Sequence, residues 1–199
     1  MHVVGSLPER RSNMAGCVAD DGYLYIYGGQ DLKEGVLSSL WRIQLSEALK
    51  GDVTWENITA TTTNAPSYAF SHHCGVCYQN KLYFFGGYRQ YAGNLGKYDR
   101  SKVRMKNSLP QSINILDLAT FRWTIGPTLN VPRDDFAWAF DDVRGKLYVF
   151  GGFVNQVKVN DLMCFDLETR KFSSINEGTS RPASANSEMS GTQLSKIFQ

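Results

Sequence analysis

Several features that would assign a function class are missing from this sequence. Its four cysteines are too few for a disulfide framework in a chain of 199 residues. It contains no run of about 18 apolar residues that could span a membrane, and residues 1–8 lack the apolar core of a secretory signal peptide. These absences predict a protein of a reducing, cytoplasmic compartment with no membrane partner.

The signatures of common enzymes are also missing. The sequence has no Gly-x-Ser-x-Gly motif and no phosphate-binding loop. Two of its three histidines are adjacent, so separate loops cannot bring together a multi-histidine metal centre. The net charge of +2 is too small to indicate nucleic acid as a partner. We therefore expect no catalytic residues and no cofactor.

The main positive feature is a repeated strand that ends in two glycines. It occurs at residues 23–29, 81–87 and 146–152, at intervals of roughly 60 residues. Each copy is rich in aromatic and β-branched residues and follows a polar turn, which is typical of a β-hairpin. Small apolar residues come before each copy, and a second strand pair comes after it. The pattern predicts four strands per unit.

These units resemble the kelch repeat. The resemblance rests on the hairpin, the glycine pair, an Asp-Leu strand end in two units and a later aromatic residue. It implies an all-β fold, a partial β-propeller of four-stranded kelch blades. Two departures are modest: Gln44 replaces the aspartate of the other units, and Phe172 replaces their tryptophan. The resemblance implies that blades pack against each other through Trp55, Trp123 and Phe172.

The repeats divide the chain. We expect residues 1–8 to be the outer strand of a preceding blade, and residues 9–60, 61–128 and 129–176 to be three blades. Residues 177–199 either begin a further blade or form a flexible tail. Because propellers need typically four to eight blades to close, an open arc would expose apolar blade faces. We therefore predict that the chain is a fragment of a longer propeller, or that self-association or another chain completes the propeller.

Residues 88–109 form a long basic loop in the second blade. The loop carries six positive charges and one negative charge, together with three tyrosines. Kelch propellers bind partners through such loops, and arginine and tyrosine often dominate interface energies. We therefore expect the loop to bind an acidic protein or peptide. The predicted contact residues are Arg89, Tyr91, Tyr98, Arg100, Lys102, Arg104 and Lys106.

The loop has two other interpretations. It could be solvated chain with no partner, and its arginines and tyrosines would also suit base stacking on RNA, a lesser alternative. Loops that lead into the first strand of each blade add Arg11 and Arg133 to the predicted partner-binding residues. The structural alternative for these two arginines is hydrogen bonding between neighbouring blades.

One segment has the residue types of a metal site. His72, His73, Cys74 and Cys77 lie close in sequence, but in a strand Cys74 and Cys77 would point to opposite faces. We therefore expect buried strand residues and no metal. The sequence as a whole predicts a non-enzymatic scaffold that presents inter-strand loops to a protein or peptide partner. The alternatives are a structural subunit of a larger assembly and, less favoured, a metal-dependent enzyme.

Overall fold

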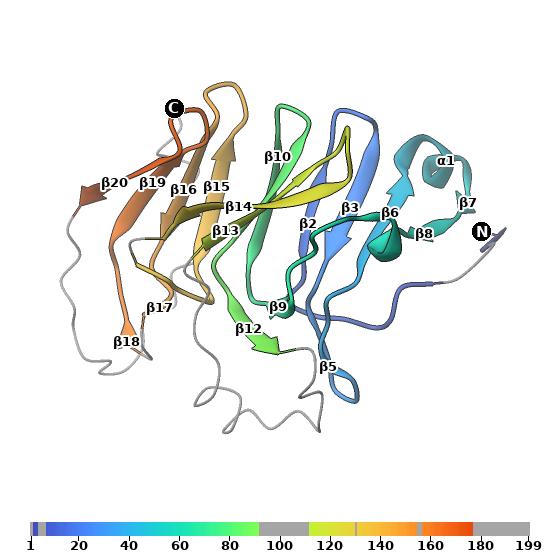
Figure 1. Cartoon of the computed structure of the whole chain (residues 1–199), viewed down its shortest axis with the longest axis horizontal. Helices are drawn as coiled ribbons and strands as arrows, with labels where there is room; N and C mark the ends of the chain where they lie inside the picture. The colour runs from blue at the N-terminus through green and yellow to red at the C-terminus, as the bar shows by residue number, and fades with distance from the viewer. Residues whose placement is uncertain (1, 4–6, 92–111, 130, 155–156, 177–199) are drawn as a thin grey trace.

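The computed structural model describes residues 2–3, 7–91, 112–129, 131–154 and 157–176, most of which form strands. Three antiparallel four-stranded sheets lie side by side (Figure 1). Each corresponds to one predicted repeat, so the partial propeller of four-stranded blades is confirmed. Blade 1 contains β2 (Ala15–Val18), β3 (Tyr23–Tyr27), β6 (Leu40–Gln44) and β8 (Trp55–Asn57). Blade 2 contains β10 (Cys74–Tyr78), β11 (Lys81–Phe85), β13 (Ser112–Asp117) and β14 (Arg122–Thr128). Blade 3 contains β15 (Ala137–Asp141), β16 (Lys146–Phe150), β19 (Leu162–Asp166) and β20 (Lys171–Asn176).

Side chains alternate along each strand, and so the middle blade, blade 2, contributes to two cores. Leu82 and Phe84 of β11 pack in the core between blades 1 and 2, whereas Tyr83 and Phe85 pack between blades 2 and 3. The predicted packing role of two aromatic residues is confirmed. Trp123 is 3% exposed in the first core, and Phe172 lies 4.4 Å from Phe165 between ring centroids at the second.

The glycine pairs are the points where neighbouring blades touch. Gly28 and Gly86 have φ values of 63° and 62°, which glycine adopts without strain. A Cβ on Gly28 would lie 2.4 Å from the carbonyl oxygen of Phe70 in blade 2. In the first two pairs the second glycine then donates its N–H to the next blade, Gly29 to Phe70 O at 2.7 Å and Gly87 to Arg133 O at 2.9 Å.

The two kelch aspartates close the turn between the last two strands of their blades. Asp117 Oδ1 accepts hydrogen bonds from the backbone N–H groups of Ala119 and Thr120, both at 3.0 Å. Asp166 makes the equivalent bonds in blade 3. Gln44 cannot form this turn in the same way. There the chain enters a helix, α1 (Leu45–Lys50), which sequence analysis did not predict and which ends at Gly51.

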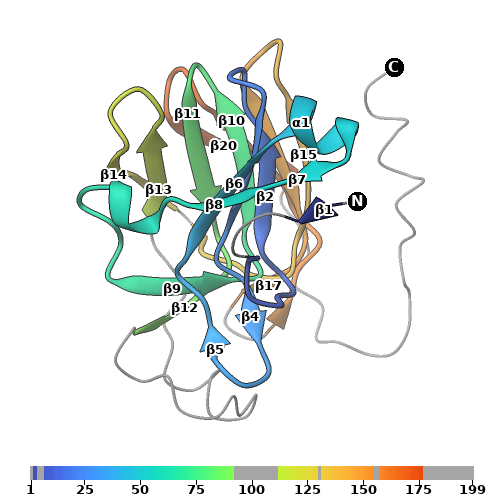
Figure 2. The ribbon, with the colours of Figure 1, turned by 90° about the vertical axis from the view of Figure 1, so that its right-hand side faces the viewer.

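Short two-stranded ribbons gather at one end of the blades (Figures 1 and 2). We call this end the loop face, and the opposite end, with the β2–β3, β10–β11 and β15–β16 turns, the turn face. The ribbons pair β4 (Gln30–Asp31) with β5 (Gly35–Val36), β9 (Tyr68–Ser71) with β12 (Tyr88–Tyr91), and β17 (Phe153–Val154) with β18 (Val157–Lys158). A short helix, η1 (Thr59–Thr61), lies in the linker between blades 1 and 2.

The first and last described elements lie near the predicted domain boundaries. β1 (His2–Val3) pairs in parallel with β7 (Asp52–Val53), just before the last strand of blade 1. The assignment of residues 1–8 to a preceding blade stays a prediction, and residues 177–199 lie outside the described residues. Phe150 is half-buried on the outward face of blade 3, whereas the equivalent Phe85 is 3% exposed beneath the next blade.

Within the described parts of the chain, no helix is both long and apolar enough to cross a membrane.

Candidate functional site: the loop face

Equivalent positions in the three blades bring polar side chains to the loop face. Asn13, His72 and Asp135 each stand two residues before the first strand of their blade, and their φ values are 54°, 58° and 52°. This left-handed conformation is uncommon outside glycine, and asparagine, aspartate and histidine adopt it most readily. The shared conformation turns the chain into the innermost strand of each blade.

His72 connects residues from all three blades. Its Nε2 lies 3.5 Å from Asp135 Oδ1 of blade 3, and its ring stacks on Tyr88 with centroids 4.8 Å apart. The Ser71 hydroxyl lies 2.8 Å from His72 Nδ1 and donates to Gln30 Oε1 of blade 1 at 3.3 Å. The Tyr88 hydroxyl donates to the same Gln30 oxygen. We call these five residues the loop-face cluster.

The cluster contains serine, histidine and aspartate, but its geometry does not suit nucleophilic catalysis. A nucleophilic serine must be reachable by substrate and have its proton taken by the histidine base. Ser71 is 0% exposed, so its oxygen cannot reach a substrate. In contrast, the Asp135 side chain is 39% exposed. The arrangement offers hydrogen-bonding groups and one accessible carboxylate, which is the chemistry of a binding surface.

Arg11 and Arg133 lie beneath this face, with side chains only 3% and 4% exposed. Arg133 donates to the carbonyl oxygen of Gly151 at 2.9 Å and holds both carboxylate oxygens of Asp161, at 2.8 and 2.7 Å. Arg11 donates to the carbonyl oxygen of Gly28 at 2.9 Å, and it also pairs with Glu9. These side-chain bonds stay within one blade. Of the two arginines, Arg133 does bond between blades, but through its backbone, since its carbonyl oxygen accepts from Gly87 N–H of blade 2 at 2.9 Å. Contact of either arginine with a partner stays a prediction.

The basic loop begins on this face but is described only at its start. Arg89 and Tyr91 lie in β12, paired through the backbone with Phe70 and Tyr68 of β9. The remaining predicted contact residues lie outside the described residues: Tyr98, Arg100, Lys102, Arg104 and Lys106. Their role in binding stays a prediction.

The two cysteines of the histidine and cysteine segment lie in strand β10, as expected, whereas His72 and His73 precede the strand. Cys74 packs between blades 2 and 3, and Cys77 packs toward blade 1, so the two thiols point to opposite faces. Burial raises the pKa of Cys77 to about 11, which keeps the thiol protonated at neutral pH. Among the described residues, no three His, Cys, Asp or Glu side chains are grouped so as to hold a metal ion.

His73 is buried in an aromatic pocket. It is 7% exposed, and its ring lies about 6 Å from those of Tyr27, Phe70 and Phe84. Neither ring nitrogen has a hydrogen-bond partner among the described residues. Burial lowers the pKa of His73 to about 3, so the imidazole is neutral at physiological pH. His73 is therefore a core residue and not a ligand of the loop face.

Comparison with known proteins agrees with this architecture. A model of the KLHDC2/KLHL20/DRC7 Kelch-repeats domain matches residues 1–193. The chain belongs to the kelch-repeat family. Kelch repeats are generally protein-interaction modules, and membership of this family suggests a protein-interaction scaffold.

Individual relatives also support membership of the kelch-repeat family. The kelch chain is 30% identical over 180 residues to "Kelch domain-containing protein 1" of Mus musculus. The matched region covers 85% of this chain and 43% of that protein. It is 31% identical over 164 residues to "Kelch domain-containing protein 2" of Mus musculus, covering 78% and 39%. It is 24% identical over 168 residues to "Kelch repeat-containing protein 2" of Saccharomyces cerevisiae, covering 81% and 17%. The kelch chain thus spans less than half the length of these relatives.

Proposed function

We propose that this kelch chain is a non-enzymatic scaffold that binds a protein or peptide partner on its loop face. The observation that carries the proposal is the loop-face cluster, in which Gln30, His72 and Asp135 join side chains of three successive blades. The three ribbons bring backbone from every blade to the same end of the molecule as the cluster (Figure 1). A partner on this face would touch all three blades at once, which gives a wide interface on a rigid support.

The basic loop supports an acidic partner. It leaves the loop face at β12, and residues 88–109 carry six positive charges against one negative charge. Such an excess accelerates association with an acidic surface and weakens as salt screens the charges over about 10 Å. We propose a cytoplasmic protein as the partner. The nuclease treatment in the test below distinguishes a protein partner from nucleic acid.

Charge reversal tests this proposal. Arg100, Lys102 and Arg104 changed together to Glu should reduce partner capture from a lysate at low salt. The matched control reverses three exposed cations at or beside turn-face turns, Arg144, Arg170 and Lys171. Capture lost in the loop variant but kept in the control supports the proposal. Equal capture by both variants contradicts it, and loss of capture after nuclease treatment would assign the loop to nucleic acid.

A structural subunit is a second candidate, favoured by the outward face of blade 3. Alternation along β16 puts Tyr148 and Phe150 on the face opposite to Leu147 and Val149, which fill the core toward blade 2. Both residues are half-buried, while the equivalent Tyr83 is 4% exposed. We propose that a second copy or another chain covers this face, because apolar blade faces favour association.

A further inference from the structure

The outer strand of blade 2 has one edge that the sheet does not use. β14 is the last strand in the order β10-β11-β13-β14. The linker from blade 1 touches this edge at a single residue, Thr63, which bridges Arg122 in parallel. Thr63 donates its N–H to Phe121 O at 2.9 Å and accepts from Trp123 N–H at 2.9 Å. Asn64, with a φ of 57°, then turns the linker away from the strand.

The next hydrogen-bonding groups along this edge have no partner strand. Backbone groups two residues apart in a strand point to the same side. The N–H and C=O of Ile125 therefore point to the edge that Trp123 N–H uses, and so does the Trp123 carbonyl. Among the described residues, no backbone hydrogen bond reaches Trp123 O or Ile125 N from that side. These two groups are the acceptor and donor that a parallel strand in the register of Thr63 would meet next.

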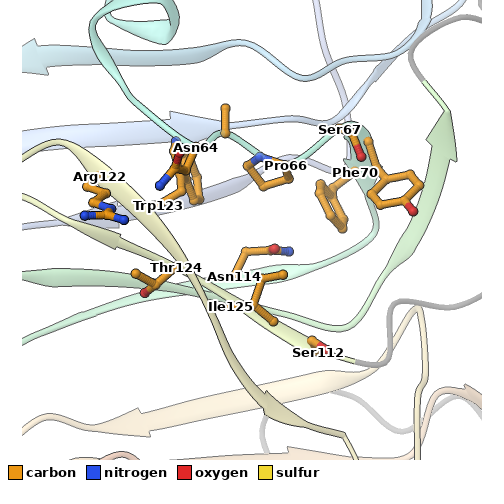
Figure 3. Close-up of a pocket in the computed structure, with 12 residues that line it drawn as sticks. Asn64, Pro66, Ser67, Phe70, Ser112, Asn114, Arg122, Trp123, Thr124 and Ile125 are labelled. Atoms are coloured by element: carbon orange, nitrogen blue, oxygen red, sulfur yellow. The ribbon is translucent and has the colours of Figure 1, made fainter.

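A cavity of about 650 Å³ lies beside this edge (Figure 3). The linker from Asn64 to Phe70 forms one wall, and β13 and β14 form the other. Trp123 lines the cavity and is 3% exposed, and its Nε1 donor has no partner among the described residues. Ile125 lines it as well, yet its side chain is 80% exposed. We call this space the rim groove.

We propose that the rim groove binds an extended segment of a partner protein, which adds to β14 as a parallel strand. A peptide N–H donates to Trp123 O, and Ile125 N–H donates to the following peptide carbonyl. This mode of recognition takes its affinity from backbone bonds and its specificity from side-chain contacts. The site borders the loop face through Tyr68 and Phe70 of β9, but it uses the edge of β14 and none of the five residues of the loop-face cluster. It therefore goes beyond the function proposed above.

The shape and charge of the groove define the occupant. Pro127 has no N–H and follows two residues after Ile125, which shortens the usable edge and opposes pairing with a whole second sheet. Arg122 is the one charged residue among those that line the groove. A short peptide with an apolar residue against Ile125 and an acidic residue toward Arg122 fits these features.

The decisive experiment uses two substitutions at one residue. Ile125→Pro removes the outward N–H and is compatible with an outer strand, whereas Ile125→Ala keeps the N–H and removes only the side chain. A displayed library of random octapeptides is selected against the whole chain, and the enriched peptides are synthesised as probes. For groove-bound peptides we expect Ile125→Pro to weaken binding about tenfold or more, and Ile125→Ala to weaken it less. Equal melting temperatures show that both variants are folded.

Amide hydrogen exchange gives an independent readout. Bound peptide should slow the exchange of the Ile125 N–H in the unchanged chain, and Asp135→Lys on the loop face should leave this binding unaffected. The proposal is overturned if no peptide is enriched, if every enriched peptide binds Ile125→Pro as tightly as the unchanged chain, or if Ile125 exchange is unaltered. Failure here leaves the loop-face proposal standing, since its test uses different residues.

Discussion

Gly86 and Gly151 have nearly the same backbone conformation, with φ values of 62° and 65°, but different surroundings. A Cβ on Gly86 would lie 2.7 Å from the Arg133 carbonyl oxygen and 2.5 Å from the Phe136 ring of blade 3. Among the described residues, a Cβ on Gly151 would meet only the Val159 carbonyl oxygen of its own blade, at 3.1 Å. The two glycines therefore separate the cost of the left-handed conformation from the cost of a close approach between blades.

Alanine at both positions tests this difference. Gly151→Ala should lower the free energy of unfolding by about 1–2 kcal/mol through backbone strain. Gly86→Ala should cost roughly 1–3 kcal/mol more, because blade 3 must move to accept the methyl group. Urea unfolding followed by circular dichroism measures both. Equal losses for the two variants would show that Gly86 is not a contact between blades.

His73 predicts a pH-dependent stability. Burial depresses the pKa of the native histidine to about 3, while an unfolded histidine titrates near 6.5. Below pH 6.5 the unfolded chain therefore binds a proton that the native chain excludes. Stability falls as the pH decreases, by about 2 kcal/mol between pH 7 and pH 5, and continues to fall toward pH 3.

The control variant follows from the repeat. His73 occupies the position of Met14 in blade 1 and Phe136 in blade 3, since each contacts the second glycine of a pair. His73→Met should remove this part of the pH dependence, and it should raise stability at neutral pH because no unpartnered nitrogen stays buried. Urea midpoints at pH 7 and pH 5 measure both effects. An unchanged pH dependence in His73→Met would show that His73 is not the responsible group.

Arg133 and Asp161 form a second testable pair. The guanidinium holds the pKa of the Asp161 carboxyl below its usual range through two hydrogen bonds. Arg133→Met leaves this carboxylate unpaired and should cost roughly 3 kcal/mol. In a double-mutant cycle with Asp161→Ala, the combined loss should be smaller than the sum of the single losses by about 1–3 kcal/mol. Loss of partner binding with unchanged stability in Arg133→Met would instead assign Arg133 to the interface.

The outward face of blade 3 predicts association in solution. Size-exclusion chromatography with light scattering should show a mass that grows with protein concentration. Phe150→Glu should shift the protein to the monomer, because a charge replaces an aromatic residue on the open face. Val143→Glu is the control, since Val143 is 86% exposed in a turn of the opposite end. A monomer at every concentration contradicts the idea that another chain covers blade 3.

The sequence predicts the blades better than the site. Each hairpin before a glycine pair is a local pattern of alternation and turn residues, and all three occur where they were expected. The linker into blade 2 contains no arginine to mark the position that Arg11 and Arg133 hold in the other two blades. The structure puts Phe70 there, because Gly29 of blade 1 bonds to Phe70 as Gly87 bonds to Arg133. Only pairing between distant residues fixes that register.

The loop-face cluster could not be predicted from local sequence pattern. Gln30, Tyr88 and Asp135 are distant in sequence, and blade packing brings them to His72. A signal did exist, since Asn13, His72 and Asp135 are residue types that adopt positive φ and they stand at equivalent places in the repeat. Helix α1 also had a signal, a run of helix-forming residues followed by Gly51.

Photo-crosslinking tests the loop-face proposal most directly. Leu32, in the β4–β5 turn of the loop face, and Val143, on the turn face, are almost equally exposed at 85% and 86%. A photoreactive amino acid replaces one or the other in the otherwise unchanged chain, and crosslinked partners are identified by mass spectrometry from a cell lysate. We predict a partner crosslinked at Leu32 and absent at Val143. The same partner crosslinked at Val143 and absent at Leu32 would contradict binding on the loop face.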